Sequence, residues 1–453
     1  MTSLPAELLA RYGTVPVPRY TSYPSANLWK PWGDGSARTV YARAGKRPLS
    51  VYVHVPFCKK LCYYCGCNMM VTRRQDLVER YLKALELEVG QIAALLPNKP
   101  EVVQLHLGGG TPTYLDVAQL TRLADTLKRH LPFAKTVEAG IEVHPPVTSF
   151  AQVRTLASLG FNRISMGVQD FDPEVQLRVN RPQPFEQTRD LIACARESGM
   201  TSVNVDLMYG LPLQTAARFS PTLDRVEELR PDRIALFGYA HMPQLKKHQK
   251  AIDAAELPGP DERLAILELT IGRLKAAGYR YIGLDHFALE GDELCKARDE
   301  GTLRRNFMGY TTCAQTDMLA FGPSAIAEVD GGFVQNEREV HDWADRIEAG
   351  KLPVVRGWES SVDDALRADL IMQLFCTLEL DTRAFGKAHR LDFATAFARE
   401  LTELQPLERD GLIELKPDRI RITPIGQLLL RNIAAVFDAW LARPADRQHS
   451  TAV

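Results

Sequence analysis

The strongest constraint on the fold is a repeated alternation of short apolar segments with longer helix-patterned ones. Six short runs rich in β-branched and aromatic residues are expected to be strands: 49–57, 102–109, 136–145, 163–169, 202–210 and 233–239. Stretches with helical periodicity lie between and after them: 75–95, 116–130, 149–160, 184–198, 219–229 and 261–277. The run 279–287 is expected to be a further strand. Such alternation predicts βα units, a parallel sheet and a full or partial barrel.

Candidate functional residues fall where these strands end. The cysteine-rich segment follows the first strand, GGGTPT (108–113) closes the second, and Glu142, Gln169 and Asp206 lie near the ends of the next three. In barrels of this kind the chemistry sits at the carboxyl ends of the strands and in the loops that follow. The position of these residues at strand ends supports both the predicted barrel and the predicted site.

The chain changes character after about residue 360, where helical patterns dominate. A helix, a short hairpin near 416–421 and a final helix resemble a small winged-helix-like module, which predicts a smaller, mainly helical C-terminal domain. Such modules often bind DNA, but 55 basic residues against 56 acidic ones give no surplus of positive charge. We therefore expect no nucleic-acid partner.

The chain shows neither a membrane-spanning stretch nor a leader. No apolar run approaches the roughly 18 residues that a membrane helix needs. The first residues, MTSLPAELLARYGTVPVPRY, lack the basic start, apolar stretch and small-residue cleavage site of a signal peptide. We expect a cytoplasmic protein without a membrane partner.

Four of the eight cysteines lie within ten residues, in HVPFCKKLCYYCGCN: Cys58, Cys62, Cys65 and Cys67. The other four are scattered and are expected to be small buried side chains: Cys194, Cys295, Cys313 and Cys376. Clustered cysteines in a large cytoplasmic chain favour metal or redox chemistry over disulfides.

The first three clustered cysteines have the spacing C-x3-C-x2-C, which suits an iron–sulfur cluster on a short loop. Cys58, Cys62 and Cys65 are predicted to bind three irons of a [4Fe–4S] cluster, leaving the fourth iron open to a cofactor or substrate. A structural zinc loop is the alternative, but zinc sites with four cysteines usually have a second C-x2-C pair. No such pair is present in the sequence.

The cysteine spacing resembles that of the radical S-adenosylmethionine superfamily. In that superfamily the open iron binds S-adenosylmethionine, and reductive cleavage yields a 5′-deoxyadenosyl radical. Further segments resemble the oxygen-independent coproporphyrinogen III oxidase family from about residue 16 to 440: PRYTSYP (18–24), YVHVPFC (52–58), CYYCGCN (62–68), GGGTPTYL (108–115), FNRISMGVQDF (161–171), VNR (179–181), VDLMYGLP (205–212), GLDHF (283–287) and RNFMGYTT (305–312). The C-x-C extension and PRYTSYP are its specific parts.

The resemblance implies an oxidoreductase of anaerobic heme biosynthesis. Two propionates of coproporphyrinogen III are decarboxylated oxidatively to vinyl groups, giving protoporphyrinogen IX. It also implies two S-adenosylmethionine molecules beside the cluster, an electron donor such as flavodoxin or ferredoxin, and a monomer.

The resemblance further implies a partial parallel (β/α)6-type barrel and a domain order. Residues 1–45 form an N-terminal extension or flap over the site, and 46–290 form the barrel with the cluster loop. Residues 291–359 complete the barrel and link it to the helical domain at 360–453.

Site residues carry over from the family by position. The cofactor-binding candidates are Tyr52, Tyr64, Gly109, Gly110, Thr111, Glu142, Gln169, Arg181, Asp206, Ala240 and Ile326. Tyr64 is a departure, because the family usually has Phe there. Glycine lets the backbone approach a cofactor closely, and a guanidinium fork suits a carboxylate.

Two assignments are hypotheses about the substrate. Cys67 is too close to Cys65 to be an easy ligand of the same cluster, and we expect it to act catalytically near the substrate radical, as a hydrogen donor or gate. Arg19, Arg304 and Arg305 are nominated to bind the propionates, since they lie in family-like segments.

Three other kinds of protein share part of this sequence pattern. A related heme chaperone resembles the barrel, but it lacks the C-x-C cysteine and carries HNxxYW where this chain reads RNFMGY (305–310). An electron-transfer or structural iron–sulfur protein is the second rival, and a radical enzyme acting on another tetrapyrrole is the third.

Overall fold

The computed structural model describes residues 4–441. The chain divides into two compact units, which we describe separately. The sheet unit consists of Trp29–Leu257 and Gln315–Glu359. The three-segment unit consists of Met1–Leu28, Pro258–Ala314 and Ser360–Val453.

The sheet unit is built on the six strands that the sequence predicts. They are β2 (Leu49–Val55), β5 (Val102–Gly109), β6 (Phe133–Val143), β7 (Arg163–Gln169), β8 (Ser202–Tyr209) and β9 (Arg233–Gly238). They pair in this order, and every pairing is parallel. The predicted parallel arrangement is therefore confirmed.

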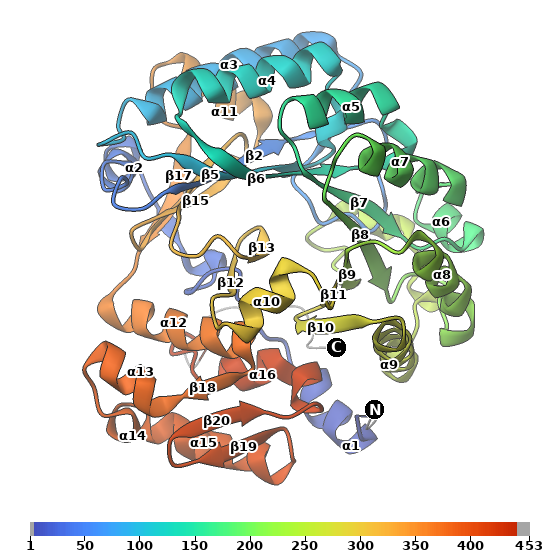
Figure 1. The fold of residues 1–453 in the computed structure, drawn as a ribbon, viewed down its shortest axis with the longest axis vertical. Helices are drawn as coiled ribbons and strands as arrows, with labels where there is room; N and C mark the ends of the chain where they lie inside the picture. The colour runs from blue at the N-terminus through green and yellow to red at the C-terminus, as the bar shows by residue number, and fades with distance from the viewer. Residues whose placement is uncertain (1–3, 442–453) are drawn as a thin grey trace. The chain divides into compact units, whose positions relative to one another are not determined.

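Helices connect these strands and lie along the outer side of the curved sheet (Figure 1). They are α3 (Gln75–Ala93), α4 (Val117–His130), α5 (Phe150–Ser158), α6 (Pro173–Arg178), α7 (Phe185–Glu197) and α8 (Ala216–Leu229). Asp116 and Ser149 begin α4 and α5 with capping boxes, each closed by a glutamine three residues later. The helices thus start where their sequences carry the local signal for it.

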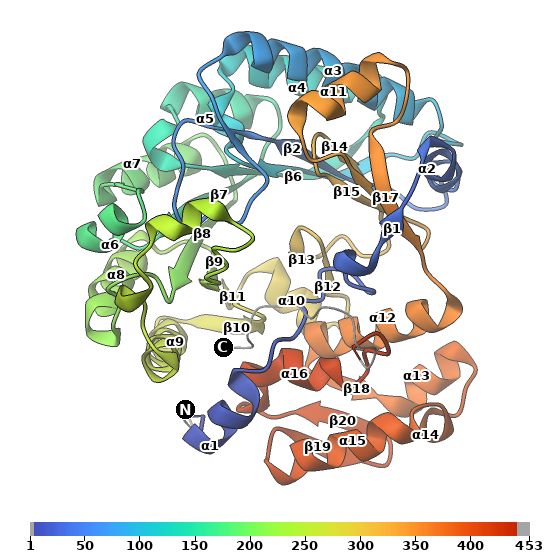
Figure 2. The same cartoon turned by 180° about the vertical axis from the view of Figure 1, so that it is seen from behind.

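The sheet continues beyond β2 with strands that the sequence analysis did not identify. They are β14 (Asp317–Phe321), β15 (Ile326–Val329), β16 (Gly332–Asn336), β17 (Val354–Glu359) and β1 (Lys30–Pro31). Strand β14 is parallel to β2, and the rest are antiparallel to their neighbours. Figure 2 shows them continuing the sheet, with α2 (Asp34–Tyr41) and α11 (Val340–Glu348) beside them. Within residues 29–257 and 315–359, no pairing joins the edges β1 and β9, so the barrel is partial.

In the three-segment unit the predicted single strand 279–287 is wrong. It is the antiparallel pair β10 (Tyr279–Gly283) and β11 (His286–Leu289). Leu284 and Asp285 form a two-residue turn in which both have positive φ, 31° and 71°. That turn usually carries Asn-Gly or Asp-Gly, and Leu-Asp gives no such signal.

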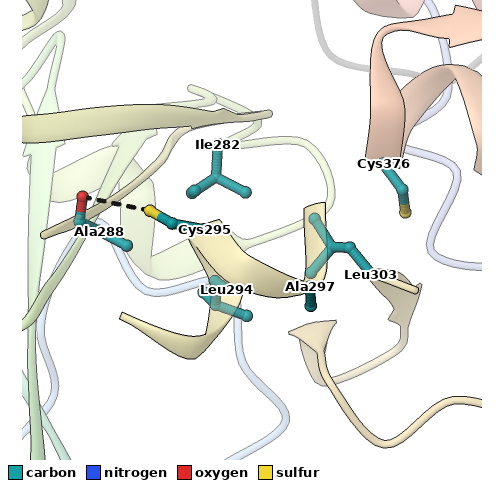
Figure 3. Packing of buried hydrophobic residues seen from close by; sticks show 7 residues of the cluster. All are labelled: Ile282, Ala288, Leu294, Cys295, Ala297, Leu303 and Cys376. Atoms are coloured by element: carbon teal, nitrogen blue, oxygen red, sulfur yellow. Dashed lines mark hydrogen bonds between the residues drawn. The ribbon is translucent and has the colours of Figure 1, made fainter. Parts of the chain in front are cut away.

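A small apolar core holds this hairpin to the elements that follow it (Figure 3). Cys295 of α10 (Glu293–Asp299) and Cys376 of α12 (Val362–Thr377) are both buried in it. Cys194 is also buried, whereas Cys313 is half-buried. The packing role is confirmed for three of the four scattered cysteines.

The C-terminal part contains the predicted helices and hairpin. After α12 come β18 (Glu379–Asp381), α13 (Thr382–His389), α14 (Phe393–Ala396), α15 (Ala398–Arg409), β19 (Ile413–Lys416), β20 (Arg419–Ile422) and α16 (Leu430–Ala435). The strands form a small sheet in the order β18-β20-β19.

Residues 4–28 pack against this part of the same unit. They begin with α1 (Ala6–Leu8). Arg431 donates hydrogen bonds to the carbonyls of Val17 and Pro18, and Tyr20 donates to Asp438 at 3.0 Å. The short β12 (Arg304–Asn306) and β13 (Gly309–Thr311) form a hairpin in this unit as well.

Between residues 4 and 441, none of the helices combines the length and apolarity of a bilayer span. The domain limits given above stay predictions.

Candidate iron–sulfur and cofactor site

The cysteine loop begins directly after β2 and lies within the sheet unit. Its ends are the short strands β3 (Phe57–Cys58) and β4 (Met70–Val71), which pair in parallel and bring residues 57 and 70 together. The loop therefore starts at the carboxyl end of a parallel strand, where the sequence analysis places the site.

Side chains from other elements hold the backbone of this loop. Their hydrogen bonds join His248 Nε2 to Cys65 O (2.7 Å), Gln249 Nε2 to Tyr64 O (3.1 Å), Asn180 Nδ2 to Leu61 O (2.7 Å) and His54 Nε2 to Asn68 O (2.7 Å). Because His54 donates through Nε2, its Nδ1 can accept from the Tyr52 hydroxyl at 3.1 Å. The conformation of the loop is thus fixed by protein contacts at both ends and in the middle.

The thiols of the loop differ in their surroundings, and burial raises the pKa of Cys58 to about 11. Arg181 Nη1 donates to Cys62 Sγ at 3.4 Å, and Cys58 Sγ lies 3.5 Å from Thr111 Oγ1. A hydrogen bond with the Cys67 thiol lowers the pKa of Cys65 to about 6. Thiolates are the form that binds iron.

In the described part of the chain, no three His, Cys, Asp or Glu side chains converge as the ligands of a single metal ion would. An iron–sulfur cube does not require this, because each thiolate binds a different iron.

The glycines after β5 let the chain pack closely against the cysteine loop. A Cβ on Gly110 would lie 2.9 Å from Phe57 O and 3.1 Å from Cys58 Sγ. A Cβ on Gly109, whose φ is +118°, would lie 2.9 Å from the His54 ring. The space next to these glycines is thus already filled by the protein. Their predicted approach to a cofactor stays a prediction.

Tyr52, His106 and Glu142 form a row across the ends of β2, β5 and β6. The rings of Tyr52 and His106 stack at 6.1 Å between centroids and 12° between planes. His106 Nε2 lies 3.3 Å from Glu142 Oε1, and Gly109 N donates to Glu142 Oε2 at 3.3 Å. Desolvation raises the pKa of Glu142, but the hydrogen bonds from His106 and Gly109 and the nearby histidine charges together outweigh it, so the pKa lies below its ordinary value. Glu142 is therefore an ionised acceptor.

Asp206 is held by two polar side chains that the sequence analysis missed. Ser165 Oγ donates to its Oδ2 at 3.1 Å, and Asn204 Nδ2 donates to its Oδ1 at 2.7 Å. Desolvation, with a smaller contribution from the Glu142 charge, raises the pKa of Asp206 to about 7. A carboxyl group with this pKa can hold or release a proton near neutral pH.

Arg181 and Gln169 carry polar atoms with spare hydrogen-bonding capacity. Arg181 donates to the Gly167 carbonyl as well as to Cys62. Its Nε and the Oε1 of Gln169 are nevertheless buried without a hydrogen-bond partner. Gln169 also adopts a positive φ, 71°, which is strained for a side chain of this kind. Orphaned polar atoms at the end of β7 and just after α6 fit a polar cofactor such as S-adenosylmethionine.

The remaining predicted residues lie in two other parts of the sheet unit. Tyr64 packs against an apolar cluster that includes Val175 and Tyr239. The side-chain amide of Gln249 donates both to the Tyr64 carbonyl (3.1 Å) and to the Ala240 carbonyl (3.3 Å). Ile326 begins β15, next to β14, whose Ala320 pairs with Tyr52. All the residues assigned to the cluster, the cofactor and the Cys67 hypothesis therefore belong to one unit.

Comparison with known proteins agrees with this geometry. The radical SAM superfamily model matches residues 52–226, and the HemN C-terminal domain model matches 361–429. The oxygen-independent coproporphyrinogen III oxidase of Salmonella typhimurium is 46% identical over 437 residues, covering 96% of this chain and 95% of that protein. The enzyme of the same name from Synechocystis is 40% identical over 450 residues, 98% and 96% of the two chains.

A solved structure agrees with these sequence comparisons. Coproporphyrinogen III oxidase (HemN) from Escherichia coli, described as a radical SAM enzyme, superposes with a TM-score of 0.91 at 45% identity. The match covers 93% of this chain and 97% of that one. The chain belongs to the oxygen-independent coproporphyrinogen III oxidase family.

Membership of the oxygen-independent coproporphyrinogen III oxidase family agrees with the resemblance found in the sequence. The chain is a radical SAM oxidoreductase, and the family implies a [4Fe–4S] cluster and S-adenosylmethionine as its cofactors. The thiols and orphaned polar atoms described above fit these two groups.

Several residues of the site were not predicted, although they contact predicted ones. They are His54, His106, Ser165, Asn204, His248 and Gln249. A signal for four of them was present, because polar residues at alternate positions of otherwise buried strands share one face. His248 and Gln249 lie in an irregular segment and had no such signal.

The arginines nominated for the substrate lie in the three-segment unit. Arg305 is half-buried and donates to the carbonyls of Arg19 (3.1 Å) and Tyr20 (2.8 Å). Arg304 donates to the carbonyls of Gly301 and Leu303. The guanidinium groups of Arg304 and Arg305 thus have protein partners, although Nε of Arg305 is buried without one, and propionate binding by the three arginines stays a prediction.

Proposed function

We propose that this chain decarboxylates two propionates of coproporphyrinogen III oxidatively, giving the vinyl groups of protoporphyrinogen IX in anaerobic heme biosynthesis. The observation that carries the proposal is the cysteine loop, fixed at the carboxyl end of β2 beside buried polar atoms without partners. Relatives of that name, aligned over 96–98% of this chain, support the substrate.

Cys58, Cys62 and Cys65 would hold the cluster, and Arg181 would stay hydrogen-bonded to Cys62. When bound, the cluster and S-adenosylmethionine would supply a 5′-deoxyadenosyl radical that takes a hydrogen atom from a propionate β-carbon, after which CO2 leaves and one electron passes to an acceptor. The chain's own part is to position this chemistry and exclude water from it.

The strand-end residues would bind the cofactor in distinct ways. Glu142 and Asp206 would accept hydrogen bonds from ribose hydroxyls or the ammonium group, and the Oε1 atom of Gln169 would accept another. The Nε atom of Arg181 would donate to a carboxylate. The other contacts would come from Tyr52, Tyr64, Gly109, Gly110, Thr111, Ala240 and Ile326.

Several finer points belong to the same proposal. Two S-adenosylmethionine molecules match two decarboxylations, and a flavodoxin or ferredoxin would supply the electrons. The protein would act as a cytoplasmic monomer. Cys67 would act near the substrate radical, and Arg19, Arg304 and Arg305 would bind propionates.

The test is anaerobic incubation of the reconstituted protein with dithionite, S-adenosylmethionine and coproporphyrinogen III. We expect protoporphyrinogen IX together with 5′-deoxyadenosine and methionine. Cleavage of S-adenosylmethionine with no change in the porphyrin would refute the substrate. Tight stoichiometric heme binding without decarboxylation would instead favour the chaperone.

A further inference from the structure

A cavity with a basic lining opens beside the cysteine loop, on the sheet unit. Its volume is about 590 Å³, and Lys59, Lys60, Arg73, His144 and Arg181 contribute to its wall. None of the residues that line it is Asp or Glu. The whole chain has a net charge of −1, so this concentration of positive charge is local.

The charges at the mouth of the cavity are exposed and uncompensated. Lys59, Lys60 and Arg73 are exposed, and none of them has an ion-pair partner among residues 4–441. The neighbouring Arg74, by contrast, is paired with Asp76. A surface that keeps several cations unpaired creates a positive potential that attracts an acidic partner.

His144, half-buried in the wall, lies among these charges. Burial lowers its pKa strongly, and the charges of Arg181, Lys60 and Lys59 lower it further. Its Nε2 is buried without a hydrogen-bond partner. Histidine thus stays neutral there, and the positive charge is carried by the lysines and arginines.

The cavity touches the outside of the loop that carries the cysteines. Lys59 and Lys60 follow Cys58 directly, and Leu61, the residue before Cys62, is held by Asn180, which also lines the cavity. Arg181, which also lines the cavity, donates to Cys62 Sγ at 3.4 Å, so a partner seated here lies one side chain away from a cluster ligand. Electron transfer between proteins falls steeply with distance, so this is a short route to the cluster.

We propose that Lys59, Lys60 and Arg73, which we call the basic face, dock an acidic protein that carries single electrons. The proposal rests on the proposed function, because only a redox cluster needs such a donor. In the docked complex the carrier is oxidised by one electron and the cluster is reduced by one. Val71, 46% exposed on β4 next to Thr72 of the cavity wall, adds an apolar contact.

A second basic segment, residues 246–250, lies near the same loop and differs from the basic face. Lys246 donates to the Cys67 carbonyl at 3.3 Å, so it serves the loop itself. Lys247 and Lys250 beside it are exposed but do not line the cavity. They offer a control with the same charge change at the same loop but outside the basic face.

The test compares a protein donor with a small one in the variant Lys60→Glu/Arg73→Glu. The probe is a reduced acidic flavodoxin, and dithionite is the donor that needs no docking surface. Two charge reversals should lower the flavodoxin-driven kcat/KM about 10-fold or more, and should flatten its dependence on salt. The dithionite-driven rate and the iron content should stay unchanged.

Binding gives a readout independent of activity. Calorimetric titration of oxidised flavodoxin should show an affinity at least about 10-fold weaker for this variant than for wild type. The control Lys247→Glu/Lys250→Glu should keep wild-type binding and rate. If the iron content fell, Arg73→Glu alone would be used, since Arg73 lies outside the loop.

Four results bear on the proposal. Unchanged flavodoxin binding in the basic-face variant would overturn the proposal, as would an equal loss in the control. Failure of wild type to cleave S-adenosylmethionine with dithionite would instead refute the proposed function. Loss of binding in the basic-face variant alone would then still support the docking surface.

Discussion

The two ends of the parallel sheet have polar side chains on the same face but use them differently. At the amino end, Ser50 donates to Gln104 at 2.6 Å, Gln104 donates to Glu138 at 2.7 Å, and Arg163 pairs with Glu138 at 2.9 Å. Two residues further along each strand are Tyr52, His106, Gly140 and Ser165, where the site begins. Alternate residues of a strand share a face, so both sets face the same interior.

The two sets of polar side chains differ in how many of their buried atoms have hydrogen-bond partners. The amino-end chain runs from β2 to β7 with each member bonded to the next. The carboxyl end keeps buried polar atoms on Gln169 and Arg181 without partners, and desolvation raises the pKa of Asp206. Polar groups that bond one another stabilise a fold, whereas buried groups with spare hydrogen-bonding capacity cost stability and can serve a ligand. The comparison predicts that mutations at the two ends affect different measurements.

The largest effect is expected from the cluster ligands at the carboxyl end. Cys58→Ala removes one of three thiolates, so both the iron content and the decarboxylase activity should be lost completely. Iron analysis and the visible absorption of the anaerobic protein check this. Cys194→Ala, a buried cysteine of α7, is the control and should keep the cluster. An intact cluster in Cys58→Ala would contradict the assignment.

Asp206 should make the carboxyl end costly to fold at neutral pH. With its pKa raised to about 7, the folded chain keeps a proton between about pH 4 and 7 that the unfolded chain has released. The free energy of unfolding should therefore fall as the pH rises through this window and level off above it. Asp206→Asn should remove this fall and gain on the order of 2–4 kcal/mol at pH 8.

Urea unfolding of the cluster-free protein at pH 5 and pH 8 measures this change. Parallel pH profiles of the unfolding free energy for wild type and Asp206→Asn would contradict the predicted destabilisation by Asp206. The same substitution should weaken S-adenosylmethionine binding, because an anionic acceptor is lost.

Arg181 tests whether the orphaned atoms serve the cofactor. Arg181→Lys keeps the charge but loses the fork that reaches Gly167, Cys62 and, through Nε, a ligand. A charged hydrogen bond is worth about 1.5–3 kcal/mol, so S-adenosylmethionine should bind about 10- to 100-fold more weakly. Equilibrium dialysis of the reconstituted protein measures this. Arg178→Lys, exposed and paired with Glu256, is the matched control and should bind normally.

The sequence predicted the parts of this comparison that depend on local pattern. The six parallel strands were identifiable because each is a short apolar run between helical ones. The cysteine spacing pointed to the cluster, and Glu142, Gln169 and Asp206 stood out as polar residues at strand ends. The polar chain at the amino end carries the same alternating signal in residues 50–54 and 104–108.

Partners that depend on distant pairing could not be read from the sequence. His54 and His248 each hydrogen-bond a backbone carbonyl of the cysteine loop. The identity of that carbonyl depends on how the loop folds, and the sequence around each histidine does not indicate it. The strands β14–β17 are short and fall in a segment without a regular alternation of strands and helices. The hairpin at Leu284–Asp285 lacks the usual glycine, so its turn had no sequence signal.

The smallest effect is expected at the amino end, where only stability should change. Glu138→Gln removes the charge that pairs with Arg163 and leaves that guanidinium partly buried, with side-chain exposures of 18% and 17%. We expect a loss of about 1–2 kcal/mol in the free energy of unfolding. Cofactor affinity and dithionite-driven turnover should stay at wild-type values, because the residue lies at the other end of the strands.

The double variant Glu138→Gln/Arg163→Met makes this prediction specific to the ion pair. It removes both charges, so part of the lost stability should return, since no unpaired cation is left in the interior. Urea unfolding of the three proteins measures the coupling. A loss of cofactor binding in Glu138→Gln equal to that of Arg181→Lys would show that the two ends are not separate, and would break the comparison.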